Sequence, residues 1–295
     1  MKALYLAAVL TLSGLVSYAQ NDTIPRKGSY LEHGQPVIED NSMFIEEAFN
    51  QEAGIIQHIS NLLIDDGNVV YAYTQEIPLA DVKHQLSFGI SYNSFKMPDE
   101  LKQFGNSEYL THGIGDLFIN YRPLLFGKSA WALVIPRFTL IAPLGDSRYG
   151  FGAGAWGGQF NLAVTKRLGK KFVTHYNAGY TAFAKADYYG VDTEGAPKFV
   201  HERNLTGTNV GASVIWFVTP RFNLMTEYAC MFQQEFMDLG TVGLNRNVVI
   251  NPGFRFAVDI GKVQIVPGVG VPLNFVNGSF QNSAAFIYLS IEPAY

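Results

Sequence analysis

The stretch of sequence that decides the fold is HQLSFGISYNS, residues 84–94. Every second position from Leu86 to Tyr92 is apolar or aromatic. The positions between them carry small or amide side chains, such as Gln85 and Asn93. Successive side chains of a β-strand point to opposite faces, so this alternation predicts a strand with one apolar face and one polar face.

The same alternation recurs along most of the chain. It predicts strands at about residues 54–64, 68–79, 82–95, 113–124, 129–142, 152–167, 170–185, 205–218, 220–234, 246–259, 261–275 and 283–293. Pro136 lies inside one of them, where the apolar phase shifts, and it predicts a bulge or kink. Most of these strands are longer than the five or six residues usual in globular proteins, and they suit tilted strands that cross a bilayer.

Composition limits how the chain could enter a membrane. Hydrophobic residues make up 48% of the sequence and charged residues 16%. After the amino-terminal region, however, the sequence offers no run of the roughly 18 apolar residues that a transmembrane helix needs. Membrane strands must close so that no backbone group faces lipid without a partner. We therefore predict an all-β fold, a transmembrane antiparallel β-barrel of about twelve strands with both termini in the periplasm.

The connections between the predicted strands alternate in length. Tight turns fall at residues 126–129, 168–171, 219–220 and 260–262, and longer polar connections at 96–112, 143–151, 186–204, 235–245 and 276–282. Barrels of the outer membrane have short periplasmic turns and long external loops, which assigns a side to each connection. The connection at 65–67 is an exception, because it is short but falls on the external side.

The amino terminus has the pattern of a secretory signal. Lys2 precedes an apolar run at 3–16, and small residues stand at Ser17 and Ala19, the two positions that a signal peptidase inspects. We predict a cleaved signal peptide at 1–19, a periplasmic amino-terminal segment at 20–53 and an outer-membrane barrel at 54–295. The expected location is the outer membrane of a Gram-negative bacterium.

Residues 20–53 do not alternate, and they suggest a plug. Residues 42–49 could form one or two helical turns with Ser42 as the N-cap. Such a short helix could rest in the barrel mouth, with Glu46 and Glu47 meeting Arg167 or Arg221. The residues of this plug hypothesis are Phe44, Glu46, Glu47 and Phe49. The alternative is a periplasmic tether with no gating role.

Charged residues on the polar strand faces are the candidates for the pore lining. Facing lipid would cost each of them a few kcal/mol, so they are expected in the lumen. They are Glu76, Asp116, Arg122, Arg137, Arg167, Arg221, Glu227, Arg255 and Asp259. Two roles are open for them: a network that fills and rigidifies the interior, or a constriction that selects solutes by charge and size.

The sequence predicts no catalytic residue, cofactor or metal. The six histidines have no zinc-like spacing, and no HExxH is present. The glycine-rich stretch at 152–157 matches a dinucleotide fingerprint only formally, because an alternating strand follows it where a helix is needed. An outer-membrane lipid-modifying enzyme, with a Ser-His-acid site assembled in space, and a structural barrel without transport are the alternatives to a channel.

Charge and the carboxy terminus indicate the partners. Without Lys2, 20 basic residues face 25 acidic ones, a net charge of −5 that argues against nucleic acid. The chain ends in an aromatic residue, Tyr295, after an alternating strand. This ending resembles the signal that the outer-membrane barrel assembly machinery recognises. We expect that machinery, outer-membrane lipid and a small-molecule solute as partners.

Three segments carry a resemblance to a known family. They are residues 44–58 (FIEEAFNQEAGIIQH), 73–76 (YTQE) and 84–87 (HQLS). Together they resemble the outer-membrane transporter family named after the MetA pathway of phenol degradation. The resemblance implies a barrel of about this size and passive diffusion of small, hydrophobic or aromatic solutes, and it supplies no catalytic residues.

Overall fold

The computed structural model describes residues 38, 42–79, 83–97, 111–126, 131–192, 195–237 and 240–293. Predictions about residues 1–37, Glu194 and Tyr295 lie outside these ranges. The strands are β1 (Gln57–Asp65), β2 (Asn68–Pro78), β3 (His84–Ser94), β4 (His112–Ile114), β5 (Leu117–Pro123), β6 (Leu133–Ala142), β7 (Gly157–Leu168), β8 (Phe172–Val191), β9 (Pro197–Thr219), β10 (Phe222–Phe236), β11 (Val242–Phe256), β12 (Val258–Ile260), β13 (Val263–Gly270), β14 (Leu273–Val276), β15 (Ser279–Ser283) and β16 (Ala285–Pro293). One short 3₁₀ helix, η2, spans Ser147–Tyr149.

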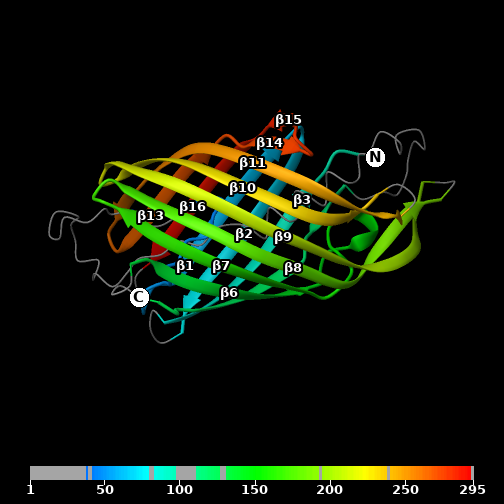
Figure 1. The fold of residues 1–295 in the computed structure, drawn as a ribbon, viewed down its shortest axis with the longest axis horizontal. Helices are drawn as coiled ribbons and strands as arrows, with labels where there is room; N and C mark the ends of the chain where they lie inside the picture. The colour runs from blue at the N-terminus through cyan, green and yellow to red at the C-terminus, as the bar shows by residue number, and fades with distance from the viewer. Residues whose placement is uncertain are drawn as a thin grey trace.

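These elements form one closed antiparallel barrel of twelve crossing strands, which confirms the predicted fold class (Figure 1). Four of the crossings are pairs of strands separated by one or two residues: β4 with β5, β11 with β12, β13 with β14, and β15 with β16. The first and last strands close the ring, because β1 pairs with β16 from His58↔Ile291 to Ile64↔Ala285. No described helix is long and apolar enough to cross a membrane.

The two faces of the strands differ as the alternation predicts. On β10, Leu224 and Tyr228 are 39% and 43% exposed on the outer face, whereas Asn223 and Glu227 on the inner face are at most 1% exposed. Exposed large apolar side chains lie on most of the long strands. A soluble monomer rarely exposes an apolar surface of this extent, so the outer face suits contact with lipid.

The barrel has two different ends. The turns at 169–171, 220–221 and 261–262 lie at one end together with Gln57 and Pro293, and we call this the turn end. The connections at 143–156, 192–196 and 237–241 lie at the other, the loop end. In Figure 1 the turn end is on the left, where the chain terminus marked C lies.

Three predicted long loops are wrong, because strands continue through them. β8 and β9 stay paired to Val191↔Pro197, which leaves 192–196 of the predicted loop 186–204. β10 and β11 shorten the next connection to 237–241, and residues 277–278 form a tight turn between β14 and β15. The extended part of the β8–β9 ribbon has solvent on both faces, so its sequence need not alternate.

The predicted irregularity at Pro136 is confirmed. β5 and β6 pair regularly as far as Tyr121↔Phe138, and the next bridge is Phe126↔Val134. Four residues, 122–125, therefore face three, 135–137, across the gap, which is the arrangement of a β-bulge. Proline has no N–H to donate, so a break in the ladder is tolerated at this position.

The outer face can be tested on β7. Leu162 lies in the middle of the strand on the outer face, and Leu168 is its last residue on the same face. Leu162→Arg should reduce the folded fraction in bilayers strongly, because arginine costs about 2–4 kcal/mol at the membrane midplane and about 0–1 kcal/mol near the interface. Leu168→Arg is the matched control. Refolding into liposomes, followed by heat-modifiable gel migration, measures both, and equal losses would contradict the assigned membrane position.

Candidate functional site

The lumen is occupied by part of the chain itself. Residues 42–51, which we call the lumenal segment, are all buried although none belongs to a strand. Asn223 Nδ2 donates to the carbonyl of Ile38 at 2.8 Å, and Gln85 Oε1 accepts from the backbone N–H of Gln51 at 2.7 Å. Both of these wall residues are the second residue of their strand from the turn end. The segment therefore enters and leaves at the same end.

Between these two contacts the segment rises into the barrel and returns. Its backbone N–H groups bond Glu227 and Asn177, each the sixth residue of its strand from the turn end. Ala48 then bonds Thr165, the fourth residue from that end. At about 3.3 Å per residue along tilted strands, the apex lies roughly 10–15 Å inside the barrel. The segment is thus a re-entrant loop in the turn-end half of the lumen.

One carboxylate holds the apex of the lumenal segment. Glu227 Oε1 accepts the backbone N–H groups of Met43, Phe44 and Ile45 at 2.8, 2.8 and 3.1 Å. Its other oxygen accepts from Asn251 Nδ2 at 2.8 Å. Three consecutive N–H groups on one oxygen form an anion-binding concavity, so Glu227 fixes the position of this turn.

Bonds to the barrel wall explain why the helix predicted at 42–49 is wrong. The structure has bends and no helical turn there. The N–H groups of Glu46 and Ala48, which a helix starting after Ser42 would use internally, are bonded to the side chains of Asn177 and Thr165 instead. Hydrogen bonds to the wall therefore override the local helix signal.

The Glu46 side chain lies among positive charges. Arg122 Nε is 3.2 Å from its Oε1, and Arg137 Nη1 is 3.4 Å from its Oε2. Asn161 Nδ2 also donates to Oε2. On the other side of Arg122, Glu76 Oε1 is 4.0 Å from Nη1. These four charged side chains are at most 2% exposed, and burying such charges is tolerable only because they are paired.

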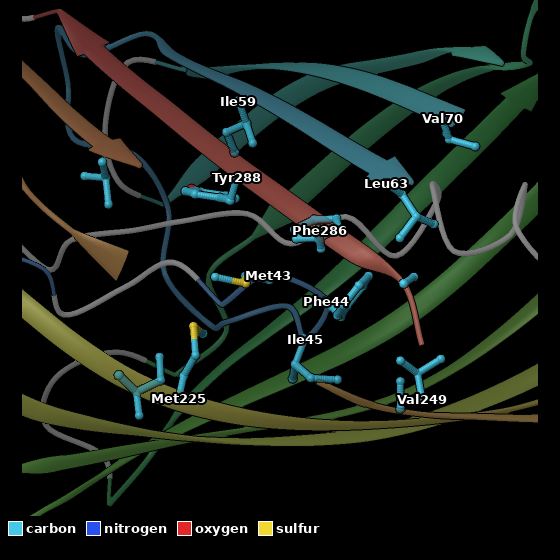
Figure 2. Packing of buried hydrophobic residues seen from close by; sticks show 14 of the residues in the cluster. Met43, Phe44, Ile45, Ile59, Leu63, Val70, Met225, Val249, Phe286 and Tyr288 are labelled. Atoms are coloured by element: carbon cyan, nitrogen blue, oxygen red, sulfur yellow. The ribbon is translucent and has the colours of Figure 1, made fainter. Parts of the chain in front are cut away.

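The apolar part of the lumenal segment packs against other strands. The ring of Phe44 lies 4.6 Å from that of Phe286 on β16, centroid to centroid. Figure 2 shows Met43, Phe44 and Ile45 between Phe286 and Tyr288 on one side and Met225 and Val249 on the other. The lumen thus has an apolar side, facing residues 43–45, and the charged side around Glu46.

Two wall glycines make room for this packing. A Cβ added to Gly268 on β13 would lie 2.9 Å from Met43 Cε, and one added to Gly211 on β9 would overlap Ile45 Cδ1. Larger residues at these positions would therefore displace the apex of the segment.

At the loop end, the 143–156 connection is bonded to the barrel wall. Asp116 accepts the N–H groups of Gly145 and Ala153 at 3.0 and 2.9 Å, which ties both sides of the 143–156 connection to the wall. Phe151 is 1% exposed and stacks on Phe95 at 5.7 Å. In the same connection, hydrogen bonds from Arg148 lower the pKa of Asp146, which caps η2. Asp116 therefore anchors a loop instead of lining an open pore.

Of the other predicted lining residues, Arg255 and Arg167 contact the barrel interior, and Arg221 and Asp259 lie at the turn end. Arg255 is fully buried in the barrel. Arg167 lies 5.9 Å over the Phe217 ring near the turn end. Arg221 and Asp259 form a 2.6 Å ion pair at the turn end, with side chains 46% and 39% exposed, so they do not join the buried charges around Glu46.

The predicted partners of Glu46 are also wrong. Glu46 meets Arg122 and Arg137, and neither Arg167 nor Arg221. Glu47 Oε2 accepts from the N–H of Ser42 at 3.3 Å within the segment, while its carbonyl accepts from Arg122. Phe49 packs edge-on to His175 at 6.4 Å.

Sequence reasoning did not single out the amides that bind the segment. Asn161, Asn177 and Gln85 lie on the polar faces of their strands, and each bonds the lumenal segment. Their signal in the sequence is that amides recur on the polar face. The alternation cannot indicate which of them have a protein partner.

The histidines and acidic residues that the structure describes assemble no metal site. His58, His84 and His175 bond the hydroxyls of Tyr73, Tyr121 and Thr165, and none of these bonds involves a serine. Within the described ranges, no group of three or more His, Cys, Asp or Glu residues could hold a metal ion.

The chain has the fold of outer-membrane β-barrel channels. An outer-membrane channel from Pseudomonas putida F1 superposes with a TM-score of 0.56 at 13% identity, covering 81% of this chain and 93% of that one. The KdgM porin (TM-score 0.43, 8% identity, 82% and 99% covered) and the NanC porin (0.44, 7%, 80% and 98%) are more distant. The sequence matches no family model, and no curated protein is similar to it.

Proposed function

We propose that the chain is an outer-membrane channel for passive diffusion of small, hydrophobic or aromatic solutes, and that the lumenal segment closes it. The turn end faces the periplasm, as short turns do in bacterial barrels. The observation that carries the proposal is the burial of residues 42–51 inside a closed barrel. In outer-membrane barrels the interior is the route that solutes take, so a segment lodged there controls passage.

The nature of the contacts favours a movable barrier. The segment is held by side chains of the wall and adds no strand to the barrel, since every crossing strand already has its neighbours in the ladder. It can leave without breaking backbone pairs of the wall. The apolar side of the lumen, with Phe286 and Tyr288, supports hydrophobic or aromatic solutes, as does the family resemblance of residues 44–58.

Whole cells test this function. Cells expressing a variant that lacks residues 42–51 should take up N-phenyl-1-naphthylamine, an apolar probe that intact outer membranes exclude, faster than cells with the empty vector. The protein should fractionate with the outer membrane and migrate heat-modifiably. Entry no faster than in the vector control, for both the full chain and a variant lacking residues 42–51, would refute the channel. Recovery by osmotic shock would refute the location.

A further inference from the structure

The side chains that bind Glu46 belong to the barrel wall, so they stay in place if the lumenal segment moves out. Arg122, Arg137 and Asn161 stand on the neighbouring strands β5, β6 and β7 and converge on one carboxylate. Two guanidinium groups and an amide are donors that match the acceptor geometry of a carboxylate. We propose that this is a solute site, that Glu46 occupies it in the closed state as a substitute for the solute, and that the channel passes small organic acids.

Wall residues hold two of these donors in place. Arg137 Nη2 donates to Gln159 Oε1, and Gln159 in turn donates to Thr181 Oγ1 at 2.8 Å. Asn209 Nδ2 donates to Asn161 Oδ1 at 3.4 Å. None of these supporting residues belongs to the lumenal segment, so the donors keep their orientation when the segment moves out.

Charge gives the second argument. In the closed state, Arg122 and Arg137 face the two carboxylates of Glu46 and Glu76. When the segment leaves, Glu46 goes with it and Glu76 remains on β2, so two positive charges face one negative charge. A partly desolvated excess guanidinium favours an anion in the position that Glu46 vacated. An incoming carboxylate therefore replaces the closing contact and stabilises the open state.

The apolar side of the lumen, opposite the arginines, suits the part of the solute that is not the carboxylate. The surface that Phe44 covers includes Phe286, with the ring of Tyr288 next to it (Figure 2). Aromatic rings of the wall suit an aromatic or aliphatic body. The lumen thus favours a small acid with one carboxylate and a hydrocarbon part, such as benzoate, over a neutral hydrocarbon. This inference rests on the proposed channel function and narrows its solute class.

The test uses benzoate as the current carrier. A variant lacking residues 42–51 is placed in planar bilayers under a tenfold gradient of sodium benzoate, and the reversal potential gives the ratio of benzoate to sodium permeability. We expect benzoate to be favoured at least about fivefold, because charge-assisted pairs with arginine are the strong ones. In the same background, Arg137→Gln and Asn161→Ala should each lower the ratio severalfold.

Arg221→Gln removes the same charge at the exposed turn end and is the matched control, since it should leave the ratio unchanged. Heat-modifiable migration verifies the fold of each variant. If the folded deletion variant conducts no ions, the channel function itself fails. If it conducts but benzoate and sodium permeate equally, or if Arg221→Gln lowers the ratio as much as Arg137→Gln, the carboxylate site fails while the channel stands.

Discussion

Deleting residues 42–51 should raise the single-channel conductance about tenfold or more, from a nearly closed state, without preventing insertion. Barrels of eight strands are filled by side chains and those of sixteen or more leave an aqueous channel, so twelve strands enclose a lumen that a single segment can block. Every residue of the segment is buried, so the segment packs closely against the surrounding wall. Planar-bilayer recordings at fixed salt measure the change.

The wall should survive this deletion. The strand ladder closes between β1 and β16 without any residue of the segment. Arg122 and Arg137 lose Glu46, but water enters the emptied lumen and partly hydrates them, which removes most of the cost of a buried unpaired charge. Deleting the equally long stretch 21–30 controls for shortening the chain ahead of β1. Unchanged conductance in a folded 42–51 deletion would mean that another element forms the barrier.

The sequence predicts the barrel well because one physical rule governs most of it. A wall between lipid and lumen requires alternating side chains, and this requirement appears directly in stretches such as 84–94 and 157–168. It weakens where both faces meet water, which is why the strands of the β8–β9 ribbon continue to Val191 and Pro197 beyond the predicted boundaries. The predicted number of strands is therefore confirmed, whereas the lengths of three predicted loops are wrong.

The site was less predictable, because it depends on contacts between distant residues. The sequence placed charges such as Arg137 and Glu227 on the polar face, but it could not pair them with residues 42–51. Met43 and Glu227, and likewise Glu46 and Arg137, are far apart in the chain and come together only through the path of the segment. The local pattern at 42–49 even indicated a helix, since a sequence pattern does not include the wall side chains that accept the N–H groups of Glu46 and Ala48.

Replacing that carboxylate should open the channel in the full-length chain. Glu227→Ala leaves the N–H groups of residues 43–45 without their acceptor in the lumen. Leaving one buried N–H group without an acceptor costs about 1–3 kcal/mol, and this substitution leaves the three N–H groups of residues 43–45 in that state. If most of this cost falls on the closed state, the ratio of open to closed channels rises by about 100-fold or more. Glu227→Gln keeps one oxygen as an acceptor and should give an intermediate increase.

Glu235→Ala is the matched control for this prediction. Glu235 is on the same strand and is also buried, but it lies near the loop end and bonds Asn245, far from the lumenal segment. Open probability in planar bilayers should therefore rise for Glu227→Ala and stay at the wild-type value for Glu235→Ala. The temperature of heat-modifiable unfolding should remain similar in both, because neither side chain takes part in the backbone ladder. Equal open probabilities in the two variants would show that Glu227 does not hold the segment closed, and that the contacts of Glu46 with Arg122 and Arg137 suffice to keep it in the lumen.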